Sequence, residues 1–162
     1  NPSEFFIKDK TEGYGTVLSI VIEGTRGIGV EVQALTNTTK FGFAKQSANG
    51  FSLSRLNMLN ALITNKTKFN LTEKDVYLNI VGGIKVKEPG IDLAVCIAVI
   101  SSLLKKPVKS NSVFWGEVGL VGELRGVRLN QVRLKESKNT GAVNIFSPDK
   151  YKSLGDVISK CF

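Results

Sequence analysis

The stretch Glu88-Pro-Gly-Ile-Asp-Leu-Ala-Val95 decides how this chain is organised, because it opens the longest apolar run of the sequence. The run continues to Leu104 and ends before Lys105-Lys106-Pro107, where a proline cannot continue a helix. A segment that is apolar nearly all round is typical of a helix buried in a domain. We therefore expect residues 91–104 to form a central helix that begins near Asp92, too short to cross a membrane.

Segments on both sides of this helix predict further elements. Thr16–Glu23 and Ile28–Leu35 alternate and are rich in β-branched residues, which indicates a strand pair around a turn at residues 24–27. Leucines recur every three to four residues in 52–63, which predicts an amphipathic helix capped by Ser52. We expect further strands at residues 75–81, 112–118, 123–128 and 142–146, and a polar helix at 132–139. The elements lack a regular strand–helix–strand rhythm, so the expected fold is α+β.

The composition fits one domain. The chain has 162 residues, of which 42% are hydrophobic, enough for an ordinary core. Residues 1–14 are polar and predict a connector, which leaves residues 15–162 as the domain. The chain begins without methionine or a signal-peptide pattern, so we expect a piece of a longer protein. Cys96 lies inside the apolar run and predicts a buried, reduced thiol, as in a cytoplasmic protein.

Positive charge is concentrated in one part of the chain. The net charge is +8, and residues 105–138 hold eight lysines and arginines against three glutamates. Such clustering favours a polyanionic partner, with nucleic acid first. The alternative is that the lysines reflect only the base composition of the genome and keep the protein soluble.

Several kinds of chemistry are excluded by missing residues. The chain has no histidine, which removes the usual general base and the commonest metal ligand. It has no Cys-x-x-Cys pair and no Gly-x-x-x-x-Gly-Lys-Ser/Thr loop, so we expect no metal and no cofactor in this chain. A Ser-Lys dyad is the hydrolase option that remains.

A set of ordered segments, which extends to about Pro148, resembles the C-terminal domain of the RadA/Sms family of bacterial DNA repair ATPases. The segments are Asn1-Pro-Ser-Glu4, Glu23-Gly-Thr-Arg26, Val30-Glu-Val-Gln-Ala-Leu35, Arg55-Leu-Asn-Met-Leu59, Asp75-Val-Tyr-Leu-Asn-Ile-Val-Gly-Gly83, Glu88-Pro-Gly-Ile-Asp-Leu-Ala94 and Gly116-Glu-Val-Gly-Leu-Val-Gly-Glu-Leu-Arg125. The resemblance implies a parent DNA-dependent ATPase that forms a hexameric ring and drives branch migration in homologous recombination. Its ATP, Mg and Zn sites would lie outside this chain, and its partners would be DNA, further copies of itself and a recombinase filament.

The same domain is similar to the Lon protease domain, a fold of the ribosomal protein S5 domain 2 type. Lon carries its nucleophilic serine at the start of a buried helix. The run that contains this serine aligns with Glu88–Ala94, and Asp92 occupies the position of the serine. Counting without gaps from Gly116-Glu117 places Gln131 under the catalytic lysine. The dyad needs a hydroxyl and an amine that takes its proton, and this chain offers neither there. We expect a pseudo-protease in which Asp92 accepts backbone N–H bonds at its helix start. Glu88 is expected in a solvated turn with Lys85 and Lys87.

The resemblance also implies that basic residues contact DNA phosphates without reading sequence. The candidates around the last predicted helix are Arg125, Arg128, Arg133, Lys135 and Lys138, and a second cluster comprises Lys105, Lys106 and Lys109. Phe114 and Trp115 predict core or interface positions rather than a stacking surface, so phosphate contact is favoured over base stacking. Two alternatives stay open, namely a Lon-like serine peptidase and a hexamer scaffold that does not touch DNA.

Overall fold

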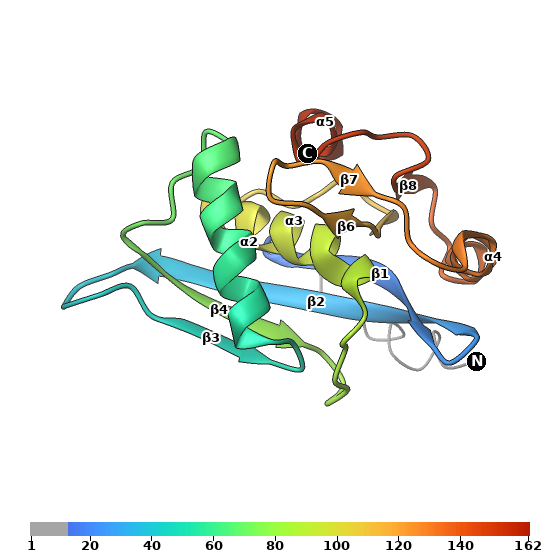
Figure 1. The fold of residues 1–162 in the computed structure, drawn as a ribbon, viewed down its shortest axis with the longest axis horizontal. Coiled ribbons are helices and arrows are strands. Elements are labelled where there is room, and N and C mark those ends of the chain that lie inside the picture. The colour runs from blue at the N-terminus through green and yellow to red at the C-terminus, as the bar shows by residue number, and fades with distance from the viewer. Residues whose placement is uncertain (1–12) are drawn as a thin grey trace.

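A mixed six-stranded sheet in the order β3-β4-β2-β1-β5-β8 frames the protein (Figure 1). This computed structural model describes residues 13–162, so most of the predicted connector lies outside the described residues. β1 and β2 pair antiparallel, as do β2 and β4, whereas β3–β4, β1–β5 and β5–β8 are parallel. The strands are β1 (Thr16–Glu23), β2 (Arg26–Thr38), β3 (Gln46–Asn49), β4 (Lys74–Ile80), β5 (Ser112–Phe114) and β8 (Asn144–Phe146). A separate hairpin joins β6 (Glu117–Val118) to β7 (Leu124–Arg125).

The predicted strand pair is confirmed, with a tighter turn. Glu23 is the register partner of Arg26, so the turn consists of Gly24 and Thr25 alone. Gly24 has a φ of 64°, a conformation that glycine adopts at low cost in two-residue hairpins. β2 then runs for 13 residues and pairs first with β1 and then with β4, a length that the short alternating segment in the sequence did not indicate.

Side chains of β1 alternate between two buried layers. Val17 and Val21 join the main core with α2 (Leu53–Lys66) and α3 (Asp92–Leu104), whereas Leu18 and Ile20 join a smaller cluster that includes Trp115. Helix α4 (Asn130–Asn139) packs against β1 and β2 and contributes Leu134 to this smaller cluster. Period-two alternation with both faces apolar explains why helices cover the strand on two sides.

The central helix is confirmed and is preceded by a short 3-10 turn, η1 (Pro89–Ile91). All residues of α3 from Asp92 to Ser102 are buried. Helix α2 has the predicted cap, in which the Ser52 hydroxyl accepts the Arg55 backbone N–H at 3.2 Å. The sequence missed β3 and α5 (Leu154–Cys161), because four mostly polar residues and a single apolar stripe over two turns give weak signals. The mixed arrangement is compatible with the α+β prediction.

Both cysteines are buried free thiols, as predicted for Cys96. Burial raises the pKa of Cys161 to about 12, so this thiol is protonated at neutral pH. Phe114 and Trp115 are fully buried, which confirms their core assignment, and Phe114 stacks on Phe146 with ring centroids 4.8 Å apart. Within residues 13–162 we find no helix of the length and apolarity that a membrane crossing requires.

Candidate functional site

The two motifs singled out in the sequence lie side by side. The Gly116 N–H donates to the Gly90 carbonyl at 2.8 Å, and the Leu93 N–H donates to the Gly116 carbonyl at 3.1 Å. Gly116 has a φ of 150°, and a Cβ there would come within 3.1 Å of Cγ of Pro148. Glycine is therefore needed for the close approach that joins the start of α3 to the segment leading into β6.

Asp92 is fully buried at the first position of α3, and its carboxylate is engaged on both oxygens. Nε of Arg55 donates to Oδ1 at 3.1 Å, and Nη2 of Arg55 donates to Oδ2 in a bidentate ion pair. The Val118 N–H also donates to Oδ2, at 3.1 Å. The sequence predicted that Asp92 accepts backbone N–H groups at its own helix start, and this was wrong about the donor, which belongs to β6.

The surroundings of this ion pair explain its protonation behaviour. Burial raises the pKa of the Asp92 carboxyl, although the bonds from Arg55 and from the Val118 N–H oppose that rise. The bond to Asp92 raises the pKa of the Arg55 guanidinium. Because guanidinium and backbone N–H groups occupy both carboxylate oxygens, Asp92 joins α3 to α2 and β6.

Gln131 lies on α4 and is exposed, whereas Asp92 is buried at the start of α3. Its amide cannot accept a proton as the amine of a Ser-Lys dyad does. Sequence reasoning did not select Arg55, since an arginine in the first turn of an amphipathic helix looks like any other surface residue. The ion pair joins positions 37 residues apart, and nothing local to either residue signals it.

A second buried ion pair lies beside the first motif. Nη1 of Arg133 is 2.8 Å from Oε2 of Glu88, and Nη2 donates to Oε1 at 3.2 Å. Arg133 also donates to the carbonyls of Ile20, at 2.9 Å, and Arg128, at 3.1 Å. A Cβ on Gly90 would come within 2.6 Å of Nη1 of Arg133, so only glycine fits under this pair.

These contacts correct two predictions. Arg133 was a DNA-binding candidate, but its side chain is fully buried and all its donors point into the protein, so this assignment was wrong. Glu88 was expected in a solvated turn with neighbouring lysines. It instead accepts the N–H groups of Ile22, at 2.8 Å, and Gly90, at 2.6 Å, besides pairing with Arg133.

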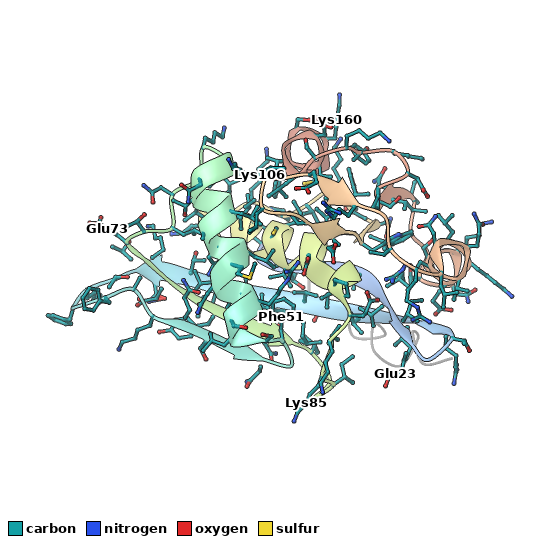
Figure 2. The ribbon with its side chains drawn as sticks, in the orientation of Figure 1. Glu23, Phe51, Glu73, Lys85, Lys106 and Lys160 are labelled. Atoms are coloured by element: carbon teal, nitrogen blue, oxygen red, sulfur yellow. The ribbon has the colours of Figure 1, made fainter. Side chains whose placement is uncertain are left out.

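A groove of about 550 Å³ lies over the first ion pair. Phe51 and Lys85, which both line it, are labelled in Figure 2, near the start of α2 and the loop after β4. Met58, Val86 and Pro89 give the groove an apolar lining, and both Arg55 and Asp92 contribute to its wall. The groove can hold a ligand, but Arg55 and Asp92 in its wall are already paired with each other, and Glu88 is paired with Arg133.

The other candidates around α4 are exposed. Lys135 and Lys138 lie on α4 itself, at one end of the molecule in Figure 1. Nη2 of Arg128 donates to the Gly24 carbonyl at 3.3 Å, and Nε of Arg125 is 3.1 Å from Oε2 of Glu123. Exposed pairs of this kind are weak and can open to a ligand. We name Arg125, Arg128, Lys135 and Lys138 the α4 basic set.

The second cluster follows α3 and is also exposed. Lys105 ends the helix with a φ of 54°, which turns the chain toward Lys106 and Lys109. The Lys109 N–H donates to the Cys161 carbonyl at 2.8 Å, so this segment adjoins the end of α5. Lys160, one residue before Cys161, is also exposed, and it was missed because α5 itself was not predicted (Figure 2).

Comparisons with known proteins agree with the segments that carry the resemblance. The chain is 40% identical over 149 residues to the DNA repair protein RadA of Listeria monocytogenes, covering 91% of this chain and 33% of that protein. It is 38% identical over 149 residues to RadA of Streptococcus pneumoniae, covering 91% of this chain and 36% of that protein. It is 41% identical over 160 residues to RadA of Campylobacter jejuni, covering 99% of this chain and 35% of that protein.

The resemblance to RadA proteins is thereby confirmed at the level of the relatives, and the chain spans about a third of their length. A family model described as the subunit ChlI of Mg-chelatase matches residues 30–150. This match includes both motifs, both buried ion pairs and every exposed basic candidate that the sequence predicted. Because the match covers most of the chain, the protein belongs to the family described as the subunit ChlI of Mg-chelatase.

Proposed function

We propose that this chain is a non-catalytic, DNA-contacting assembly domain of a RadA-like DNA repair protein. The observation that carries the proposal is the state of Asp92, whose two carboxylate oxygens are bound by Arg55 and the Val118 N–H. A residue at the position of a nucleophile that is committed to structure indicates a domain that binds rather than cleaves. The relatives named DNA repair protein RadA support a role in DNA repair.

The proposed fold is Lon-like. The buried helix that begins directly after the Pro89–Ile91 turn, beside the segment at Gly116, supports this proposal, since Lon carries its nucleophilic serine at the start of a buried helix. Here the two polar positions of the dyad are Asp92 and Gln131, which provide neither a hydroxyl nor an amine. The framework is retained and the groove beside it persists, whereas the chemistry of peptide hydrolysis is lost.

DNA would be held by phosphate contacts from exposed cations. The α4 basic set and the cluster of Lys105, Lys106 and Lys109 are exposed and are carried on flexible side chains, as non-specific phosphate contacts require. We place this domain in a cytoplasmic, hexameric, DNA-dependent ATPase that promotes branch migration and cooperates with a recombinase filament. ATP, Mg and Zn would bind to the remainder of that parent protein.

Removing the α4 basic set is expected to weaken binding to single-stranded DNA and to reduce its salt dependence. The slope of log K against log salt falls by about 0.7 for every phosphate of a single strand that the protein no longer neutralises. The variant Arg125→Ala/Arg128→Ala/Lys135→Ala/Lys138→Ala should therefore show a flatter slope between about 50 and about 200 mM salt. Fluorescence anisotropy with a labelled oligonucleotide measures both the affinity and the slope.

The matched control removes four exposed lysines elsewhere, as Lys66→Ala/Lys68→Ala/Lys150→Ala/Lys152→Ala, with the same change in net charge. Equal losses in the two variants would mean that net charge alone attracts DNA, and the assigned surface would be wrong. If the unmodified chain forms hexamers in sedimentation but binds no DNA at low salt, the domain is a scaffold instead.

Peptidase activity is expected to be absent. Labelled casein and fluorogenic peptides should be turned over no faster by the unmodified chain than by its Asp92→Ala or Lys135→Ala variants, because no dyad is present. Lys135 is tested because it lies one turn of α4 beyond Gln131, the position of the dyad lysine. The assay should be read beside circular dichroism, since Asp92→Ala also removes structural contacts. Turnover that Asp92→Ala or Lys135→Ala abolishes in a folded variant would contradict the proposal and favour the Lon-like peptidase.

A further inference from the structure

The loop between β2 and β3 presents two phenylalanines to solvent. Phe41 is 87% exposed and Phe43 is 95% exposed, more than any other large apolar side chain of residues 13–162. Gly42 between them has a φ of 68°, a left-handed conformation that suits glycine. In Figure 1 this loop projects from one end of the sheet, away from the end that carries α4. We name residues 39–45 the aromatic loop.

The base of the aromatic loop is held firmly. The Asp75 carboxylate accepts the Thr39 hydroxyl at 2.9 Å and the Lys45 backbone N–H at 2.8 Å, so one side chain closes both ends of the loop. The Thr39 N–H donates to the Glu73 carbonyl at 2.9 Å, and the Val76 N–H donates to the Lys45 carbonyl at 2.9 Å. These bonds anchor the backbone while leaving the tip in solvent. The two rings are therefore displayed from a fixed base.

The charges beside the rings indicate what the loop fits. Lys40 and Lys45 flank the phenylalanines and are exposed, and none of the ion pairs among residues 13–162 uses either lysine. Exposed aromatic rings next to such cations match a ligand that offers both flat apolar faces and negative charge. A single-stranded nucleic acid has this chemistry, since its bases stack on aromatic rings and its phosphates attract lysine. In a duplex the bases are already stacked on one another.

We propose that the aromatic loop binds single-stranded DNA by stacking bases on Phe41 and Phe43, with Lys40 and Lys45 contacting the adjoining phosphates. This inference rests on the proposed DNA-contacting function and adds base stacking to it, at a position far along the chain from the α4 basic set. The basic segments of the sequence predicted phosphate contact alone, since they contain no interleaved aromatic residues, whereas this loop contains two. The loop gives the domain a preference for single strands over duplex.

The test compares the chain with Phe41→Ala/Phe43→Ala, using a labelled oligothymidylate and a duplex of equal length. Stacking on one aromatic ring is worth roughly 5- to 150-fold in affinity, so the double variant should bind oligothymidylate at least about 10-fold more weakly. The salt slope should stay unchanged, and duplex binding should be unaffected. Phe41→Leu/Phe43→Leu should be nearly as weak as the alanine variant, because leucine is apolar but offers no ring.

The matched control is Val121→Ala/Val143→Ala, which trims apolar side chains that are 72% and 74% exposed and should leave affinity unchanged. A Phe43→Trp variant should lose tryptophan fluorescence when oligothymidylate binds, above a constant signal from the buried Trp115. Full affinity in Phe41→Ala/Phe43→Ala, or in the leucine variant, would overturn the inference while leaving the phosphate-binding proposal intact. If the alanine variant changes only sedimentation, the loop contacts protein and the inference is wrong. If the unmodified chain binds no DNA, both proposals fail together.

Discussion

Arg55→Ala is expected to lower the free energy of unfolding by about 3–5 kcal/mol, because it leaves the buried carboxylate of Asp92 without its counter-charge. Asp92→Ala should cost less, about 1–3 kcal/mol. It leaves the Val118 N–H without its acceptor, but Arg55 is 31% exposed and can turn toward water. The double replacement Arg55→Met/Asp92→Leu should recover much of the loss, since apolar side chains often substitute for a buried ion pair. Urea unfolding followed by circular dichroism measures all three.

The loss in free energy of unfolding caused by Arg55→Ala should become smaller as the pH falls. Burial raises the pKa of Asp92 above its ordinary value, and without Arg55 nothing but the Val118 N–H opposes that rise. A carboxyl with a raised pKa in the folded state is most favourable when protonated. The destabilisation caused by the unpaired Asp92 carboxyl is therefore absent below the pKa that this carboxyl has in the unfolded state. It reaches its full size as the pH rises through the pKa of the folded state. Arg26→Ala, at an exposed hairpin position, is the control and should change stability by less than about 0.5 kcal/mol. A similarly small change in Arg55→Ala at neutral pH would refute the assigned role of the pair.

Arg133→Ala is expected to destabilise the chain by a similar amount, about 3–5 kcal/mol, because it removes a fully buried side chain and leaves Glu88, which is only 18% exposed, without its counter-charge. The carbonyls of Ile20 and Arg128 lose donors at the same time. Arg133→Lys should restore only part of the loss, since an ammonium group cannot reproduce the planar fork that reaches Glu88 and Ile20 together. Thermal and urea unfolding report the stability, and the far-ultraviolet spectrum reports whether each variant folds.

The same experiment separates a structural arginine from a DNA-binding one. Lys135→Ala, two residues further along α4 and exposed, should leave stability within about 0.5 kcal/mol and weaken DNA binding. Arg133→Lys should show the reverse, with lower stability and unchanged DNA affinity per folded molecule. Unchanged stability in Arg133→Ala together with lost DNA binding would restore the assignment that the sequence suggested.

Patterns in the sequence predicted most of the fold, but the strand expected at residues 112–118 is divided at Gly116 between β5 and β6, which belong to different sheets. The central helix, the β1–β2 pair and the Ser52 cap were all predicted, because hydrophobic period and capping chemistry are local properties. β3 was missed since its four residues, Gln46–Asn49, are mostly polar and it becomes a strand only by pairing with β4. α5 was missed for a similar reason, because its single apolar stripe is short and is stabilised as a helix only by packing against the core.

The candidate site divides in the same way. The sequence by itself determined that the chain lacks histidine and that Asp92 begins the buried helix, because residue identity and helical pattern are read directly. Only the tertiary structure decided what each charged residue does. Arg55 meets Asp92 across 37 positions and Arg133 meets Glu88 across 45, whereas Lys135 stays in water. The identity of a basic residue does not tell whether its side chain is buried or exposed, because contacts between segments that are distant in the sequence decide this. The same holds for Phe41 and Phe43, which the folded chain leaves in solvent at the tip of an anchored loop.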